Sequence, residues 1–135
     1  MTRPNSESTN KAVIYCRSAT TTSGVTRDNA KDYIPLSKQA AIGREFARSQ
    51  GYDVTATFND IISGNTRDRP GFNQLLEHLR ISGQYSIIIA DHSRLARSLD
   101  IYHELKTWLA AIGGVVQIAE AHQELPEWMV KHAAN

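Results

Sequence analysis

The sequence predicts an α/β fold in which helices cover both faces of a mostly parallel sheet, in three layers. Short apolar segments alternate along the chain with longer amphipathic ones, and Gly or Pro residues separate them. The chain has 135 residues, enough for one domain around one hydrophobic core. We therefore expect a single sandwiched sheet.

Four strands are predicted, at residues 12–16, 54–58, 86–90 and 115–119. The first is a continuous apolar run from Ala12 to Cys16, which is typical of a strand buried on both faces. In the second, Val54, Ala56 and Phe58 alternate with polar residues, which indicates a half-buried strand. The first strand is thus expected near the centre of the sheet.

Three helices are predicted between these strands. Apolar residues at three- and four-residue intervals indicate a helix from Pro35 to Gly51, and Pro70 is well placed to begin a second helix that Gly83 ends. A third helix is expected to run without a break from about Leu95 to Ile112.

The alternating order of strands and helices requires parallel pairing, with right-handed crossovers. Ligands of such folds bind beyond the carboxyl ends of the strands. Three polar segments follow these ends, at residues 17–33, 59–69 and 91–97. They are the expected place for a functional site.

Composition excludes several classes of protein. Hydrophobic residues make up 41% and charged residues 21%, and no apolar run reaches the ~18 residues that span a bilayer. Residues 1–11 are polar, so we expect a disordered leader without a secretory signal and a cytoplasmic protein.

The single cysteine, Cys16, excludes an internal disulfide, and the histidines lack ligand spacing, so neither a metal nor a cofactor is expected.

Each of the three polar segments carries arginine, although the net charge is only +1. If the segments meet at one edge of the sheet, the guanidinium groups could bind a phosphodiester, because the planar fork matches two phosphate oxygens. Solvated surface arginines are the alternative. The five residues are Arg17, Arg67, Arg69, Arg94 and Arg97.

Several motifs in this order resemble the catalytic domain of the serine site-specific recombinases of the resolvase and invertase type. The similarity covers about residues 12–120, and we assign that range to a resolvase-like catalytic domain. The motifs are Tyr15-Cys16-Arg17, Gln39, the loop Asp60-Ile61-Ile62-Ser63-Gly64, the segment Asp68-Arg69-Pro70-Gly71-Phe72, and Ser93-Arg94-Leu95-Ala96-Arg97.

The resemblance implies DNA strand exchange by transesterification without a metal. A serine hydroxyl would attack a DNA phosphate to leave a 5′-phosphoserine link and a free 3′-hydroxyl, while arginines stabilise the charge of the transition state. By position, the phosphate would be held by Arg17, Arg69, Arg94 and Arg97. Gln39, Ser93 and Asp68 would support them.

At the position of the nucleophile, two residues after Arg17, this chain has Ala19. Alanine has no hydroxyl, so cleavage is not expected unless another residue substitutes. Ser18 and Thr20 are the nearest candidates. Ser18 should point to the opposite face, and Thr20, Thr21, Thr22 and Ser23 could reach the phosphate only if the loop reorganised. An engineered substitution and a natural loss of cleavage both fit the sequence.

The family normally continues into a long helix that builds the dimer and tetramer, and then into a DNA-binding domain. Residues 121–135 are expected to form only a short tail or a truncated helix. Expected partners are the DNA backbone, bound weakly by this chain alone, and a second copy or another recombinase. One alternative is a non-catalytic, recombinase-like regulator that binds such partners, and another is an unrelated α/β phosphohydrolase or anion-binding protein.

Overall fold

The computed structural model describes residues 10–19, 23, 34–82 and 85–120. Its sheet has the strand order β2-β1-β3-β4, and all neighbouring strands are parallel. The strands are β1 (Lys11–Ser18), β2 (Asp53–Ile61), β3 (Tyr85–Ile89) and β4 (Gly114–Ile118). The predicted α/β class and the central place of the first strand are confirmed, although β1 begins at Lys11, inside the expected leader.

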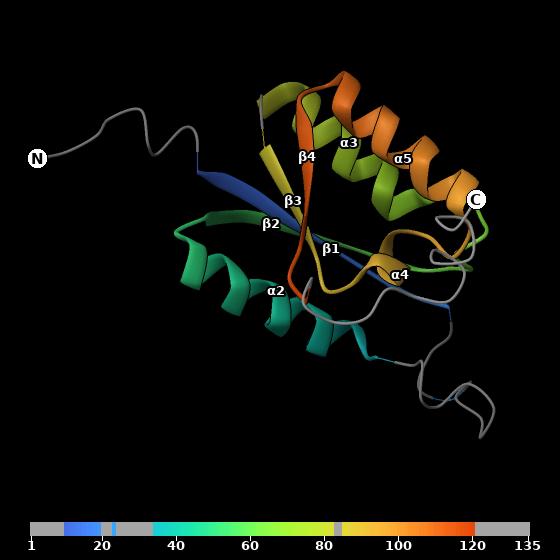
Figure 1. Ribbon diagram of the computed structural model, residues 1–135, viewed down its shortest axis with the longest axis horizontal. Helices are drawn as coiled ribbons and strands as arrows, with labels where there is room; N and C mark the ends of the chain where they lie inside the picture. The colour runs from blue at the N-terminus through green and yellow to red at the C-terminus, as the bar shows by residue number, and fades with distance from the viewer. Residues whose placement is uncertain (1–9, 20–22, 24–33, 83–84, 121–135) are drawn as a thin grey trace, which may run out of the picture.

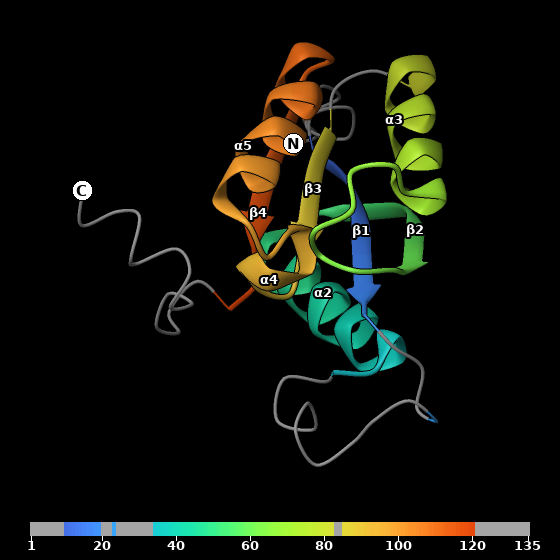
Figure 2. The same ribbon diagram turned by 90° about the vertical axis from the view of Figure 1, so that its right-hand side faces the viewer.

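Helices cover the sheet unequally. The helices are α2 (Leu36–Gln50), α3 (Pro70–Ser82), the single turn α4 (His92–Leu95) and α5 (Leu99–Ala111). In Figure 1, α3 and α5 lie on one side of the sheet and α2 lies on the other, and Figure 2 shows the same layers from the side. The three-layer arrangement expected from the sequence is therefore confirmed.

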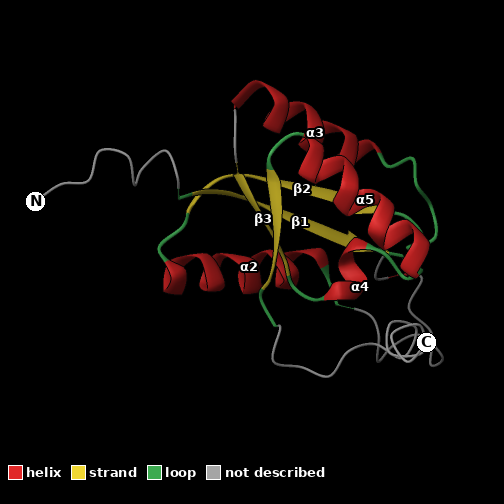
Figure 3. Ribbon diagram, turned by 45° about the horizontal axis from the view of Figure 1, so that its top comes forward, coloured by secondary structure: helices red, strands yellow, loops and turns green. Residues whose placement is uncertain are grey.

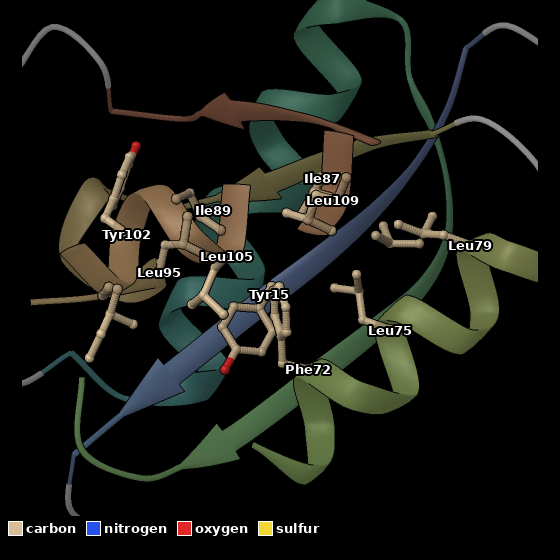
Figure 4. Packing of buried hydrophobic residues seen from close by; sticks show 13 residues of the cluster. Tyr15, Phe72, Leu75, Leu79, Ile87, Ile89, Leu95, Tyr102, Leu105 and Leu109 are labelled. Atoms are coloured by element: carbon tan, nitrogen blue, oxygen red, sulfur yellow. The ribbon is translucent and has the colours of Figure 1, made fainter. Parts of the chain in front are cut away.

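The larger part of the core lies between the sheet and the pair α3 and α5. It contains Val13 and Tyr15 of β1 together with Leu75 and Leu105 of the two helices, all fully buried (Figure 4). On the other face, Ile14 and Cys16 pack against the small residues of α2. Because successive side chains of a strand point to opposite faces, β1 contributes to both clusters.

The edge strand β2 has the alternating burial expected of a half-buried strand. Before β2 begins, α2 ends at Gly51, whose φ of 81° lies in the left-handed region that favours glycine. The helix that follows, α3, begins at Pro70 as predicted.

The prediction of one helix from Leu95 to Ile112 is wrong. The chain forms α4, becomes extended at Ala96 (φ −163°, ψ 164°), and begins α5 at Leu99. Two hydrogen bonds between residues that are distant in the sequence explain the break. Nη1 of Arg69 donates to the carbonyl of Leu95, and the backbone N–H of Arg97 donates to the carbonyl of Gly64. A continuous helix would need these same backbone groups.

The carboxyl ends of the strands and the turn α4 lie at one end of the molecule (Figure 3). Here the backbone N–H of Ile62, just after β2, bonds to the carbonyl of Ser18 at the end of β1. Within the described parts of the chain, none of the helices has the length and apolar character to cross a membrane.

Candidate functional site

Arg17 lies at the carboxyl end of β1, and its side chain is turned into the protein. The residue is 1% exposed, and all three of its side-chain nitrogens bond to backbone carbonyls. Nε donates to Arg94 (3.2 Å), Nη1 to Ile62 (2.8 Å) and Nη2 to Ser93 (2.6 Å). Arg17 therefore joins the loops that follow β2 and β3.

Gln39 of α2 holds the backbone of Arg17. Its Oε1 accepts from the N–H of Arg17 (3.1 Å), and its Nε2 donates to the carbonyl of the same residue (2.9 Å). The pairing of β1 with β3 extends only to Ile14, so beyond that point the amide of Gln39 takes the place of a strand neighbour. Gln39 therefore fixes the backbone of Arg17, and its supporting role toward a phosphate stays a prediction.

Arg69 precedes α3 and is fully buried. Nε donates to the carbonyl of Thr66 (2.8 Å), Nη2 to that of Gly64 (3.2 Å), and Nη1 to that of Leu95. Nη1 also lies 3.4 Å from the hydroxyl of Tyr15. Arg69 thus shapes its own loop and connects it to α4.

Arg94 is also buried, whereas Arg97 is exposed. Arg94 donates through Nη1 to the carbonyl of Arg17 (3.2 Å) and through Nε to Asp91 Oδ1 (3.3 Å). The same carboxylate accepts from the N–H of Ser93 (2.9 Å) and so caps α4. A Cβ on Gly64 would lie 2.6 Å from Cγ of Arg97, so a glycine is needed where the two loops meet.

The structure therefore brings four of the predicted arginines to one place, with Arg17, Arg69 and Arg94 buried beneath the surface and Arg97 upon it. We call these four residues the arginine cluster. Arg67 does not join it, because its Nε pairs with Glu104 on α5. Asp68 also lies apart, exposed and bonded through Oδ1 to Asn73 Nδ2 (3.0 Å).

Tyr15 and Asp60 belong to the site but were not among the predicted site residues. Asp60 accepts from the N–H groups of Gly71 (2.7 Å) and Phe72 (2.9 Å), and from the hydroxyl of Tyr15 (2.7 Å). Asp60 thereby caps the first turn of α3. Both residues lie in motifs that the sequence singled out. The continuous apolar run was a signal that Tyr15 is buried, but Asp60 lies in a polar segment that gave no such signal.

The charges of the cluster act on one another. Burial first, and then the nearby Arg94, Arg69 and Arg97, lower the pKa of Arg17 to about 10, against an opposing effect from Tyr15. Arg17 still carries its charge at neutral pH. Burial, together with its hydrogen bond to Asp60, raises the pKa of the Tyr15 hydroxyl well above its usual value, although Arg69 opposes this shift. The hydroxyl therefore stays protonated and donates to Asp60.

Ala19 is exposed just beyond the end of β1. Ser18 is 3% exposed and points into the fold, so it is not presented to solvent beside the arginine cluster. Ser23 is exposed, and Thr20, Thr21 and Thr22 lie outside the described residues. The described residues contain no group of His, Cys, Asp and Glu side chains that could hold a metal.

Three solved structures illustrate the similarity of the fold. The C-terminal catalytic domain of ISC1926 TnpA, an IS607-like serine recombinase, matches with a TM-score of 0.63 and 22% identity over 92% of this chain and 76% of that one. A resolvase family site-specific recombinase from Streptococcus pneumoniae gives 0.61 and 16% over 92% and 84%. A serine recombinase from Sulfolobus solfataricus gives 0.57 and 22% over 92% and 77%.

No curated protein sequence matches the chain significantly. The model of the family described as the resolvase N-terminal domain matches residues 12–129, which is most of the chain. The fold, the ordered motifs and this match agree: the chain has the fold of serine recombinase catalytic domains and belongs to the resolvase family as a resolvase N-terminal domain.

Proposed function

We propose that this domain binds a DNA phosphodiester over Ala19 and Arg97 and does not cleave it. The observation that carries the proposal is that the exposed Ala19 stands two residues after Arg17, next to the arginine cluster in the chain. Cleavage needs an oxygen that attacks phosphorus, and position 19 offers none. The adjacent hydroxyl, on Ser18, is buried.

The buried arginines support phosphate binding through their charge. Among the described residues, the carboxylates bonded within or beside the cluster are Asp60 and Asp91, so its four guanidinium groups leave an excess of positive charge. This charge lies beneath the surface at Arg97, where solvent screens it less than it screens a surface cation. An anion at the rim would interact with all four groups, although only Arg97 is exposed to contact it directly.

A binding experiment tests the phosphate site. Fluorescence anisotropy on a labelled duplex should show weak binding that falls steeply as salt rises, because the contacts are to phosphates. Arg97→Ala should weaken binding and lower the salt slope by about 1. Arg80→Ala is the matched control, since Arg80 is an exposed arginine paired with Glu77 on α3. Equal effects of the two substitutions would contradict the proposed site.

A second experiment tests the loss of cleavage. The chain and its Ala19→Ser variant are each fused to a DNA-binding domain of known target, so that both reach the same labelled duplex. We expect a covalent protein–DNA adduct from Ala19→Ser, with phosphate mapped to residue 19 by mass spectrometry, and none from the unsubstituted chain. An adduct from the unsubstituted chain would overturn the proposal, and its loss in Ser18→Ala would identify Ser18 as the nucleophile.

The fold and the arginine cluster are present although position 19 has no hydroxyl, and this also favours a second candidate function, that of a non-catalytic regulator. Such a protein would occupy DNA or associate with an active recombinase without cutting. If Ala19→Ser binds the duplex as tightly as the unsubstituted chain but yields no adduct, the missing hydroxyl is not the main cause of inactivity, and the regulator becomes the better account. Co-purification with an active family member would then test association with a partner.

A further inference from the structure

The turn α4 determines where two of the arginines lie. Its successive carbonyls at Ser93, Arg94 and Leu95 accept hydrogen bonds from the side chains of Arg17 and Arg69. With only four residues, α4 is too short to be stable alone, so contacts with the rest of the protein must hold it. Whatever holds α4 also positions the arginine cluster.

One side-chain hydrogen bond connects the first residue of α4 to α5. His92 Nδ1 lies 2.7 Å from the hydroxyl of Tyr102, and the two ring centroids are 5.6 Å apart. Tyr102 is 4% exposed and belongs to the same core cluster as Leu95 of α4 (Figure 4). The bond therefore joins α4 to a helix that is fixed in the core.

The pKa shifts of both residues keep this hydrogen bond between uncharged groups. Burial raises the pKa of Tyr102 to about 12, so its hydroxyl keeps its proton. Burial and the charge of Lys106 lower the pKa of His92, although Asp91 opposes them, and the imidazole is neutral at pH 7. The bond therefore joins two neutral groups: the Tyr102 hydroxyl donates to Nδ1 when the ring proton of His92 is on Nε2, and it accepts from Nδ1 in the other tautomer.

We propose that His92 and Tyr102 are positioning residues for the arginine cluster: their hydrogen bond fixes α4 against α5, and α4 in turn fixes Arg17 and Arg69. Burial of Leu95 and Ala96 also anchors α4, but apolar contacts are not directional, whereas a hydrogen bond sets orientation. The importance of this positioning for DNA binding rests on the proposed function.

The test uses the full chain and two independent measurements. Solvent exchange of the Nε–H groups of Arg17 and Arg69 is measured by NMR, with the backbone amide of Ile88 in the central sheet as an internal control for global unfolding. The dissociation constant for a labelled duplex is measured at low salt. His92→Leu and Tyr102→Phe each remove the bond, while His92→Asn keeps an acceptor near the position of Nδ1.

We expect His92→Leu and Tyr102→Phe to speed Nε–H exchange relative to the Ile88 amide and to weaken DNA binding about fivefold. The double variant should be little worse than either single one, because both remove the same bond. His92→Asn should restore both readouts. His78→Leu, on the half-buried histidine of α3 that packs against Phe58 of β2, should change neither.

The inference is overturned if His92→Leu leaves Nε–H exchange unchanged, or if His92→Asn is as impaired as His92→Leu. The exchange measurement tests this inference without any DNA present. Failure of the proposed function looks different, because then the unsubstituted chain and Arg97→Ala bind the duplex equally while the exchange results remain as expected.

Discussion

At the scale of single residues, Asp60 shows how one carboxylate can organise a site without touching a ligand. Its two oxygens accept from two backbone N–H groups of α3 and from the hydroxyl of Tyr15. All three donors would be left without an acceptor if the carboxylate were removed, and buried donors without partners are costly.

We therefore expect Asp60→Asn to lower the free energy of unfolding by about 2 kcal/mol, because the amide nitrogen of the substituted side chain would face a hydrogen-bond donor. Asp68→Asn is the matched control: Asp68 is exposed and accepts from the Asn73 side chain, so its change should stay within about 0.5 kcal/mol. Urea unfolding followed by circular dichroism gives both values. Similar losses in the two variants would show that Asp60 is not the cap described here.

Individual arginines also mark the limit of prediction from the sequence. Their convergence could be predicted, because parallel strands place their carboxyl ends at one edge of the sheet. The sequence could not show that Arg17 and Arg69 bond to backbone carbonyls, since those partners lie up to 77 residues away along the chain. It likewise could not show that Arg67 pairs with Glu104.

At the scale of elements, patterns local in sequence predicted the strands and the first two helices well. The apolar run of β1, the alternation in β2 and the signals at Gly51 and Pro70 depend on neighbouring residues alone. The break between α4 and α5 depends on bonds from Arg69 and Gly64, so no local pattern could have revealed it.

The contact between α3 and β2 depends on Gly71. A Cβ at this position would overlap the carbonyl oxygen of Asn59 and lie 2.9 Å from the carboxylate of Asp60. Backbone cannot move aside as a side chain can, so Gly71→Ala should force α3 away from its cap and lower the free energy of unfolding by about 2 kcal/mol.

Gly43→Ala is the comparison, because there the nearest atoms, at 3.0–3.2 Å, belong to the side chain of Ile14. The better helix propensity of alanine would offset part of the crowding, so its net effect should stay within about 1 kcal/mol. Thermal and urea unfolding of both variants test the difference. A smaller decrease in the free energy of unfolding for Gly71→Ala than for Gly43→Ala would contradict the close approach of α3 to β2.

At the scale of the whole molecule, two unequal cores meet at one strand. The cluster beneath α3 and α5 is the larger, and the cluster beneath α2 relies on small side chains such as Ala40 and Ala47. β1 belongs to both clusters and carries Arg17 as its last residue but one, so the site extends directly from the best-buried strand of the fold. A rigid base of this kind suits a site that must hold several like charges close together.

Stability of the whole domain should fall in mild acid partly through His92. Its folded pKa lies below the value of 6.5 that it would have when unfolded, so above that pH both states are neutral and His92 has no effect. As the pH falls below 6.5, the unfolded chain binds a proton that the folded chain does not, and the free energy of unfolding decreases until the folded pKa is reached.

His92→Asn removes this titration while keeping a hydrogen-bond acceptor. Between pH 7.5 and pH 5.5, the unsubstituted chain should lose more stability than His92→Asn, by less than about 1 kcal/mol because solvent screens the partly exposed ring. Urea unfolding at both pH values measures the difference, and the other groups that titrate in acid contribute equally to both proteins. An equal or larger loss in His92→Asn would mean that the folded imidazole accepts a proton as readily as the unfolded one.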